Sequence, residues 1–360
     1  MYKLICSLLI AFFSLNLSAS TLEIMSYNVE NLFDTYHDEH HNDFEYLPFG
    51  HPAKEEGCRN IENSYYRGKC FRNNWDMMQF NTKLRTIVDV VRREGRELPD
   101  VLALVEVESR KVMEALADEL GYEHFYITDG QDERGINVGV LVNVSAQLSV
   151  ISYEEIQLNS SRLKKPTRNV LEVTLKIGGE VLKIYINHWP SQNNPTSDRI
   201  YAAEMVRKKV IKNSENGYHS MVVGDLNVKS SESPNPIENI LVNGASKMID
   251  VESEFREDPT ISEQLKRSIP PSSYYYKRGN DWTHLDRILV SPSLLNGVGT
   301  DVELESFDIF AHSDYSTPTR ARDDRGVNYD THKPLRFNYH GNGRSEGASD
   351  HFPVSVKLSL

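Results

Sequence analysis

The chain lacks net positive charge, internal repeats and low-complexity tracts. Its 360 residues carry a formal net charge of −12, so no general basic character points to nucleic acid. A local basic stripe or bound cations can still receive phosphate groups, so the acidity leaves such a partner open. The chain has no internal repeat, no low-complexity tract and no linker-like stretch. Hydrophobic residues make up 39% of it, which is enough for a core.

A long apolar run is also missing. The apolar stretch at residues 4–17 is too short to span a bilayer well, and Ser14 and Asn16 interrupt it. Lys3 precedes the stretch, and the small residues 18–20 follow it. This order is typical of a secretory signal peptide and is preferred to a membrane anchor. We therefore expect an exported protein, periplasmic or secreted, whose residues 1–20 are removed.

Cysteine is rare, with three residues in all and two after the expected signal peptide, Cys58 and Cys70. A zinc site is a poor match, because a second pair of cysteines at the usual spacing is missing. In an exported protein such a pair most simply forms a disulfide, with two free thiols as the alternative.

The remaining residues, 21–360, are expected to form a single domain with two long polar inserts. The inserts lie near 34–74 and 312–347. Segment 34–74 has no clear periodicity, and a segment this long is usually a functional surface insert. Its His- and Asp-rich part at 37–43 is interpreted as a solvated acidic loop rather than a metal site, because it has no defined ligand spacing.

Strand and helix patterns alternate along the rest of the chain, which favours an α/β fold. Segment 227–273 is an exception and is expected to be rich in loops, because it contains several prolines, among them Pro234, Pro236, Pro270 and Pro271. The expected helices cover 75–94, 111–120 and 197–212, with Ser197 as a cap of the last. The expected strands cover 22–27, 101–105, 137–142, 170–177, 181–186, 221–223, 285–290, 302–310 and 352–358.

The stretch MVVGDLNV at 221–228 combines a buried strand with two polar residues. Three apolar residues are followed by Gly224, which allows a sharp turn and is expected to end the strand. Asp225 and Asn227 come next, and residues two apart in extended chain point to the same side. A carboxylate and a carboxamide at the carboxyl end of a strand suit a hydrated cation or a phosphate oxygen. An ordinary turn after a strand is the alternative.

Similar polar residues follow or begin other expected strands. Because polar residues recur at several strand ends, we expect them to line one shared cleft at a sheet edge. They are Asn28, Glu30, Glu106, His188, Asp225, Asn227, Asp286, Asp350 and His351.

Six blocks that contain these residues resemble the endonuclease/exonuclease/phosphatase superfamily, which includes pancreatic-type DNase, and most closely its secreted bacterial members. The resemblance spans residues 27–354. It implies a DNase I-like α/β fold, a four-layer sandwich of two packed mixed β-sheets flanked by helices. The blocks are YNVEN (27–31), LALVEVES (102–109), INHWPSQ (186–192), VVGDLNV (222–228), HLDRILVS (284–291) and ASDHFPV (348–354).

The resemblance also implies divalent-metal-dependent hydrolysis of a phosphoester. Glu106 matches the principal metal ligand of the family, assisted by Asn28 and less securely by Glu30, and Asp350 lies beside the metal. Mg²⁺ suits this set because it takes oxygen ligands and keeps several waters, with Mn²⁺ or Ca²⁺ as alternatives.

The remaining roles concern proton transfer and phosphate binding. By resemblance, Asp225 and Asn227 orient the attacking water and the phosphate, and Asp286 partners the active-site His351. His188 matches a second histidine, a candidate acid for the leaving oxygen. Simpler structural roles are possible for two of these residues. His188 could cap a loop, and Asp286 could form an ion pair with Arg287. Surface or structural roles are preferred to phosphate contact for Arg134, Arg199 and Arg336.

A secreted DNA endonuclease is the first expectation for function, with DNA as the partner and no stable protein partner. The two histidines favour a DNase-like mechanism. The alternatives on the same fold are a sphingomyelinase or other phospholipid phosphodiesterase, and a phosphatase of a phosphorylated small molecule. A non-catalytic exported binding protein is less favoured, because the whole set of polar residues is present.

Overall fold

The computed structural model describes residues 20–360 apart from 159–160, 324–325, 327 and 339–346. The expected signal peptide therefore lies outside the described residues, except for its last position. Within the described part, no helix combines the length and apolar character needed to cross a membrane.

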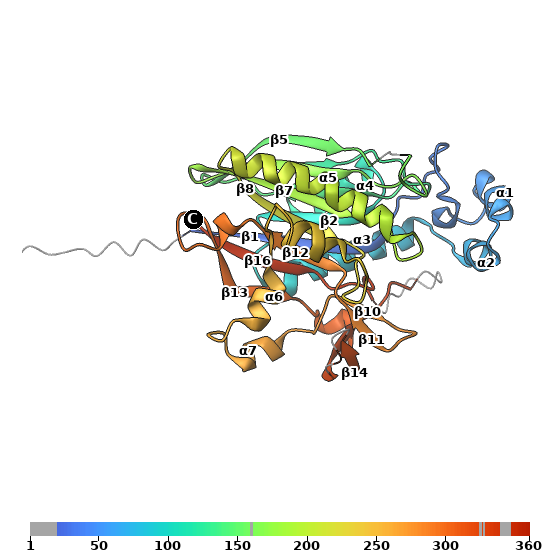
Figure 1. The fold of residues 1–360 in the computed structure, drawn as a ribbon. Helices are drawn as coiled ribbons and strands as arrows, with labels where there is room; N and C mark the ends of the chain where they lie inside the picture. Colours follow the sequence, from blue (N-terminus) through green and yellow to red (C-terminus); the bar gives the residue numbers. More distant parts are fainter. Residues whose placement is uncertain (1–19, 159–160, 324–325, 327, 339–346) are drawn as a thin grey trace, which may run out of the picture.

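Two six-stranded sheets form the centre of the structure (Figure 1). Both are mixed, because β1 pairs with β2 and β7 with β8 in parallel, whereas the other pairs are antiparallel. The first sheet has the order β13-β16-β1-β2-β4-β3, from β1 (Thr21–Leu32), β2 (Val101–Val107), β3 (His124–Ile127), β4 (Asn137–Val142), β13 (Asp301–Ile309) and β16 (Val354–Ser359). The second has the order β5-β6-β7-β8-β12-β9, from β5 (Leu148–Ile156), β6 (Val170–Ile177), β7 (Glu180–His188), β8 (His219–Asp225), β9 (Ile249–Asp250) and β12 (Asp286–Val290).

The α-helices are α1 (Pro52–Asn60), α2 (Ser64–Arg72), α3 (Met77–Arg92), α4 (Arg110–Leu120), α5 (Thr196–Glu215), α6 (Val251–Glu257) and α7 (Glu263–Ser268). Helices α3 and α4 pack on the outer face of the first sheet and α5 on that of the second, whereas α1 and α2 lie beside the sheets (Figure 1). Short turns of other helix types are η1 (Phe44–Tyr46), η2 (Arg93–Gly95), η3 (Ile237–Val242), η4 (Pro292–Leu294) and η5 (Ser313–Tyr315).

The alternation of side chains along β2 explains the layers. Val101 and Ala103 face the core between the two sheets, whereas Leu102 and Leu104 face a second core that includes residues of α3 and α4. Successive residues of a strand point to opposite faces, so a strand that is apolar throughout can join two cores. On the second sheet, Tyr185, Val222 and Leu289 pack against α5, which crosses its outer face (Figure 1). The expected four-layer sandwich is confirmed.

Three segments that were expected to be loops contain regular structure. The insert at 34–74 contains α1 and α2, and segment 227–273 contains η3, α6 and α7. These helices are short and their ends are capped: Asn63 accepts hydrogen bonds from two amides of α2, and Asp250 does the same for α6. Pattern reading missed them, because elements of six to nine residues are too short to show a helical period.

The third such segment, the insert at 312–347, contains two strands of a four-stranded sheet. This third sheet has the order β10-β11-β14-β15 and consists of β10 (Tyr274–Tyr276), β11 (Asp281–Thr283), β14 (Ser316–Asp323) and β15 (Asn328–Pro334). One of its faces is polar and solvated, which is why the sequence reads as a polar insert.

The disulfide between Cys58 and Cys70 is present and joins α1 to α2, with Cα atoms 5.6 Å apart. Both cysteines are fully buried. The cross-link closes a short loop, because its sequence separation is 12.

We predict that the double substitution of Cys58 and Cys70 by serine lowers the free energy of unfolding by about 3 kcal/mol, because the unfolded chain regains loop entropy. Urea unfolding followed by circular dichroism measures the loss. Dithiothreitol should destabilise the wild type by a similar amount and leave the double variant unchanged. Equal stability of wild type and variant would show that α1 and α2 unfold independently of the sheets.

Candidate active site

Strand register in the second sheet aligns three candidate residues. His188 is the last residue of β7 and pairs with Asp225, the last residue of β8. Asp225 pairs in turn with Asp286, the first residue of the antiparallel strand β12. Directly paired residues lie about 5 Å apart, so one row of side chains crosses the sheet at its edge.

The first sheet contributes Asn28 from β1 and Glu106 from β2 to the same edge. The Glu106 carboxylate accepts a hydrogen bond from the backbone amide of Asn31 at 3.0 Å. The backbone is unusual here, because Glu30, Asn31 and Glu106 have φ values of +51°, +58° and +66°. Non-glycine residues rarely adopt such values, and clusters of them are typical of functional sites.

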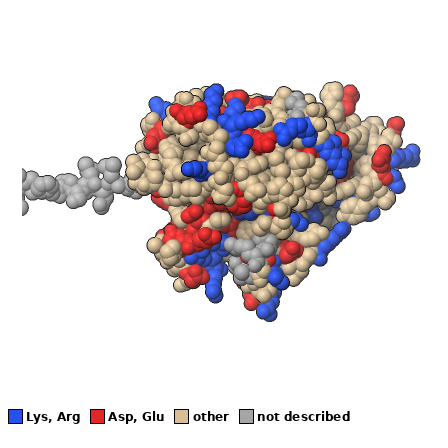
Figure 2. Space-filling model, in the orientation of Figure 1, with Lys and Arg blue, Asp and Glu red and all other residues tan. Residues whose placement is uncertain are grey.

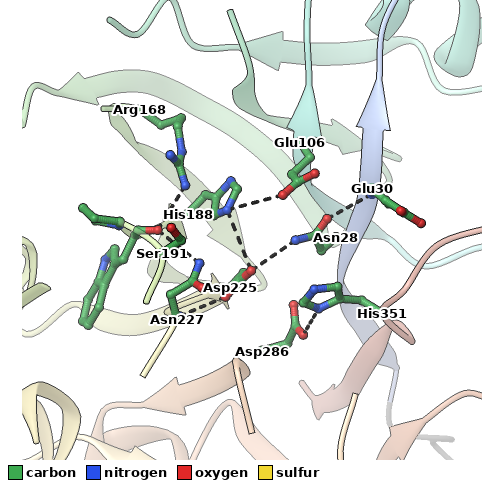
Figure 3. Close-up of polar contacts among 12 residues, drawn as sticks. Asn28, Glu30, Glu106, Arg168, His188, Ser191, Asp225, Asn227, Asp286 and His351 are labelled. Carbon is green, nitrogen blue, oxygen red and sulfur yellow. Dashed lines mark hydrogen bonds and ion pairs between the residues drawn. The ribbon is translucent and has the colours of Figure 1, made fainter. Parts of the chain in front are cut away.

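The two sheets meet at these side chains (Figure 3). The side-chain amide of Asn28 donates a hydrogen bond to Asp225 Oδ2 at 3.1 Å. His188 Nε2 lies 3.7 Å from Glu106 Oε1 and 3.8 Å from Asp225 Oδ2. The structure therefore brings together Asn28, Glu106, His188 and Asp225, as expected of one shared cleft.

The turn after β8 differs from the sequence interpretation in two respects. Gly224 does not end the strand. It lies within β8 at φ +118°, where a Cβ atom would come within 2.1 Å of the Asn187 carbonyl oxygen of β7, so glycine permits this close approach. Asn227 is left-handed, with φ +51°, rather than extended. Its amide donates to Asp225 Oδ1 at 2.9 Å, a local turn that keeps the two residues together.

His351 and Asp286 form a buried hydrogen-bonded pair, with His351 Nδ1 2.6 Å from Asp286 Oδ2. The hydroxyl of Ser273 donates to the same carboxylate oxygen at 2.5 Å. Burial alone would lower the pKa of His351, but the Asp286 carboxylate outweighs it and raises that pKa to about 10. His351 is therefore an imidazolium at neutral pH, and Asp286 pairs with His351 instead of with Arg287.

His188 is in the opposite state. Burial, reinforced by the positive charges of Arg168 and Arg134, lowers its pKa well below the usual value. The neutral ring donates or accepts hydrogen bonds but has no extra proton to release in the free protein. This state disfavours the expected acid role of His188, which stays a prediction.

A second charged group lies beside His351. Arg336 donates to Glu30 at 2.7 Å and pairs with Asp350 at 2.9 Å. Burial, followed by the negative charge of Asp350, raises the pKa of Glu30 to about 7. The Glu30 carboxylate thus binds Arg336, and Figure 3 shows its side chain directed away from Glu106. Asp350 Oδ1 lies 3.9 Å from His351 Nε2.

Sequence reasoning missed three residues here: Lys83, Ser273 and Arg168. Lys83 is fully buried and donates to the carbonyl oxygen of Ala348, which precedes the Ser-Asp-His block. Its position in the apolar phase of α3, at helical spacing from Phe80, was a usable signal. Arg168 donates to the Trp189 carbonyl at 3.0 Å and had no such signal.

The three arginines named as phosphate candidates differ. Arg199 is buried and bonded to Glu232, a structural role. Its helix begins without the expected Ser197 cap, since Pro195 occupies the cap position. Arg134 donates to Asn31 Oδ1 at 3.1 Å, and the backbone amide of the same Asn31 binds Glu106.

The donor set at this edge fits a hard divalent cation. Among the described residues, no group of three His, Cys, Asp or Glu side chains is arranged to hold a metal. Mg²⁺ does not need one, because it keeps several waters and takes one or two carboxylates. Burial, followed by the nearby Asp286 carboxylate, raises the pKa of Asp225 to about 7. A bound cation would stabilise the ionised form of these neighbouring carboxylates.

The model of the endonuclease/exonuclease/phosphatase family matches residues 23–360. The chain belongs to this family. A search of curated protein sequences found no match.

Solved structures of the same fold cover nearly the whole chain. A D. rerio TDP2, humanised by 14 mutations, has a TM-score of 0.56 at 15% identity, over 94% of this chain and 99% of its own. D. rerio TDP2 in complex with a single-strand DNA product has a TM-score of 0.55 at 14% identity, over 95% and 100%. A mannosyl-6-phosphatase from Bacteroides thetaiotaomicron has a TM-score of 0.50 at 14% identity, over 94% and 100%. At these identities the similarity shows the fold alone.

We predict that Asp286→Asn moves the alkaline limb of the kcat/KM profile to lower pH by roughly 1–3 units, because the carboxylate no longer favours imidazolium. The sign follows from the raised pKa: activity that needs protonated His351 is present below that pKa and lost as pH rises through it. Circular dichroism controls for folding. An unmoved alkaline limb in a folded, active variant would show that His351 is not the group that titrates.

Proposed function

We propose that the chain is an exported, divalent-metal-dependent phosphodiesterase that hydrolyses DNA. The observation that carries the proposal is the meeting of two unlike histidines and three carboxylates at one edge of both sheets. Protonated His351 pairs with Asp286, and neutral His188 faces Glu106 and Asp225. Phosphoester hydrolysis needs such a division between groups that bind charge and groups that move protons.

Asp225 is the candidate that takes the proton of the attacking water. Its pKa of about 7 suits a general base near neutral pH. Its orientation is fixed by hydrogen bonds from the Asn28 side chain at 3.1 Å and the Asn227 amide at 2.9 Å. A carboxylate held on both oxygens loses little freedom when water binds, which lowers the entropy cost of alignment.

His351 is the candidate that binds the phosphoryl oxygens. Its Nδ1 is committed to Asp286, so Nε2 is the nitrogen left to face substrate. A buried imidazolium stabilises negative charge more strongly than it would in water. The Ser273 hydroxyl and the His351 ring bind the same Asp286 oxygen, which holds the ring in one orientation.

Glu106 and Asn28 would hold the cation, and Asp350 can add one oxygen because its other oxygen is paired with Arg336. A bound divalent cation supplies Lewis-acid polarisation of the phosphoryl oxygen. The left-handed backbone at Glu106 aims its carboxylate across the cleft toward His188 (Figure 3).

DNA is the proposed substrate class and export the proposed location, and one observation supports each. The D. rerio TDP2 structure holds a single-strand DNA product, so this fold accommodates a DNA strand in that protein. The buried Cys58–Cys70 disulfide supports an oxidising compartment outside the cytoplasm.

We predict that Glu106→Gln and Asp225→Asn each reduce kcat by about 10²-fold or more, because each removes a charge on which the site depends. Cleavage of plasmid DNA with Mg²⁺ measures the loss. Glu114→Gln, at a surface glutamate of α4 that pairs with Arg110, is the matched control and should keep wild-type activity. Near-normal activity of either site variant would remove that residue from the mechanism.

We predict that the purified chain releases products from DNA in the presence of Mg²⁺, Mn²⁺ or Ca²⁺, and that thorough chelation with EDTA stops the release, since the donor set suits a hard cation. Sphingomyelin and mannose 6-phosphate are assayed in parallel. Product release from either one, with none from DNA, would replace DNA as substrate while keeping the phosphoester chemistry. Turnover that survives chelation would refute the role of the metal.

A further inference from the structure

The third sheet has one buried and one exposed face, and strand pairing determines which residues lie on each. Tyr275 pairs with Trp282, and both are buried. Tyr276 pairs with Asp281, and Asp281 pairs with Arg322 of β14. Because neighbouring residues of a strand point to opposite faces, Tyr276 and Arg322 lie on the face away from the core.

This exposed face, which we name the β10–β14 face, combines aromatic and basic side chains. Tyr276 is 38% exposed, and Lys229 Nζ lies 5.6 Å from its ring centroid. Arg320 lies two residues before Arg322, on the same face, and its side chain is 79% exposed. Figure 2 shows blue side chains at the lower end of the molecule, where Figure 1 draws β14.

The charge of the β10–β14 face runs against that of the whole chain, which has 40 Lys and Arg against 52 Asp and Glu. Among the described residues, the face, its β10–β11 turn and the adjacent Lys229 supply five cations, Lys229, Lys277, Arg278, Arg320 and Arg322. The face and its turn also carry two carboxylates, Asp281 and Asp330. Asp330 is 83% exposed and its oxygen lies 3.6 Å from Arg320, so this ion pair is weak and open to competition by phosphate.

The face is continuous with the candidate active site. Tyr274 lies two residues before Tyr276, so the two rings share one face at a spacing of about 7 Å along the strand. Tyr274 pairs directly with His351 in an antiparallel bridge, and their ring centroids are 4.7 Å apart. The Phe352 amide donates to the Ser273 carbonyl at 2.8 Å. The first strand of the sheet is thereby attached to the segment that carries His351.

We propose that the β10–β14 face binds single-stranded nucleic acid and leads the strand to His351, with Tyr276 as a base-stacking platform and Arg320 and Arg322 as phosphate contacts. Stacked aromatic rings beside a basic track are the usual means of binding single strands without sequence preference. The inference rests on the proposed function, since it names the strand that the same site would cleave. It also assigns a role to an insert that the catalytic residues leave unexplained.

The test is the affinity of the full chain for a fluorescein-labelled dT20 strand, in the Asp225→Asn background with Mg²⁺, followed by fluorescence anisotropy. The double variant R320E/R322E is expected to bind about tenfold more weakly or worse, because two phosphate contacts are replaced by repulsion. The milder R320Q/R322Q should reduce the slope of log Kd against log salt by about 1.4, at roughly 0.7 per single-strand contact. Tyr276→Ala should weaken binding with the slope unchanged, since stacking releases no counterions.

The matched control is R110E/R267E, which makes the same change of charge at two arginines elsewhere. They are 68% and 80% exposed and each is paired with a glutamate of its own helix, as Arg320 is paired with Asp330. This control should bind dT20 within twofold of the parent. Equal weakening by control and R320E/R322E would show a general effect of charge and overturn the assignment, as would absence of dT20 binding by the parent.

Two further measurements separate this inference from the proposed function. Hydrolysis of bis(p-nitrophenyl) phosphate, with Asp225 intact, tests the phosphodiester chemistry and should be the same in wild type and R320E/R322E. If neither wild type nor R320E/R322E hydrolyses this compound, the proposed function is wrong. The dT20 measurements would still show whether the β10–β14 face binds single-stranded nucleic acid. Binding to phosphatidylserine vesicles is the second measurement. Loss of vesicle binding in R320E/R322E, with dT20 affinity unchanged, would assign the face to a membrane and overturn the inference.

Discussion

The site depends on one constraint, the burial of a single apolar core between two mixed sheets. Residues 101–105 of β2 are all apolar because they face this core on one side and a helix-covered core on the other. Packing the sheets face to face brings the ends of their parallel strand pairs to a common edge. The Asn28–Asp225 hydrogen bond and the His188–Glu106 approach cross that edge, so side chains of distant sequence meet there.

The charges collected at this edge are held in different states by their surroundings. Asp286 keeps His351 protonated, burial keeps His188 neutral, and burial followed by a neighbouring carboxylate raises the pKa of Asp225 and of Glu30. Desolvation disfavours every charge, so only groups with a close partner remain ionised. A phosphoester and a cation would supply the missing partners. These states are the basis for proposing an anionic substrate that binds together with a metal.

The third sheet shows how an acidic protein can present a basic surface. Net charge describes the whole chain, whereas a ligand meets the local field of the face that it approaches. β14, which carries Arg320 and Arg322, pairs with β11. β11 pairs in turn with β10, whose first residue, Tyr274, lies next to His351. The segments that supply this face lie far apart in sequence, and composition alone would average their charge away.

The sequence by itself determined the fold class and named most residues of the candidate site. Six motif blocks placed Glu106, Asp225, Asp286 and His351 at strand ends, and long apolar or periodic segments such as α3 and β4 are visible in local patterns. It could not reveal Lys83 beside Ala348, Arg336 between Glu30 and Asp350, or Ser273 on Asp286. Those contacts join residues far apart in the chain or lie in short elements. Only tertiary structure decided which histidine is charged, because burial and neighbouring charges set a pKa, and neither is encoded locally.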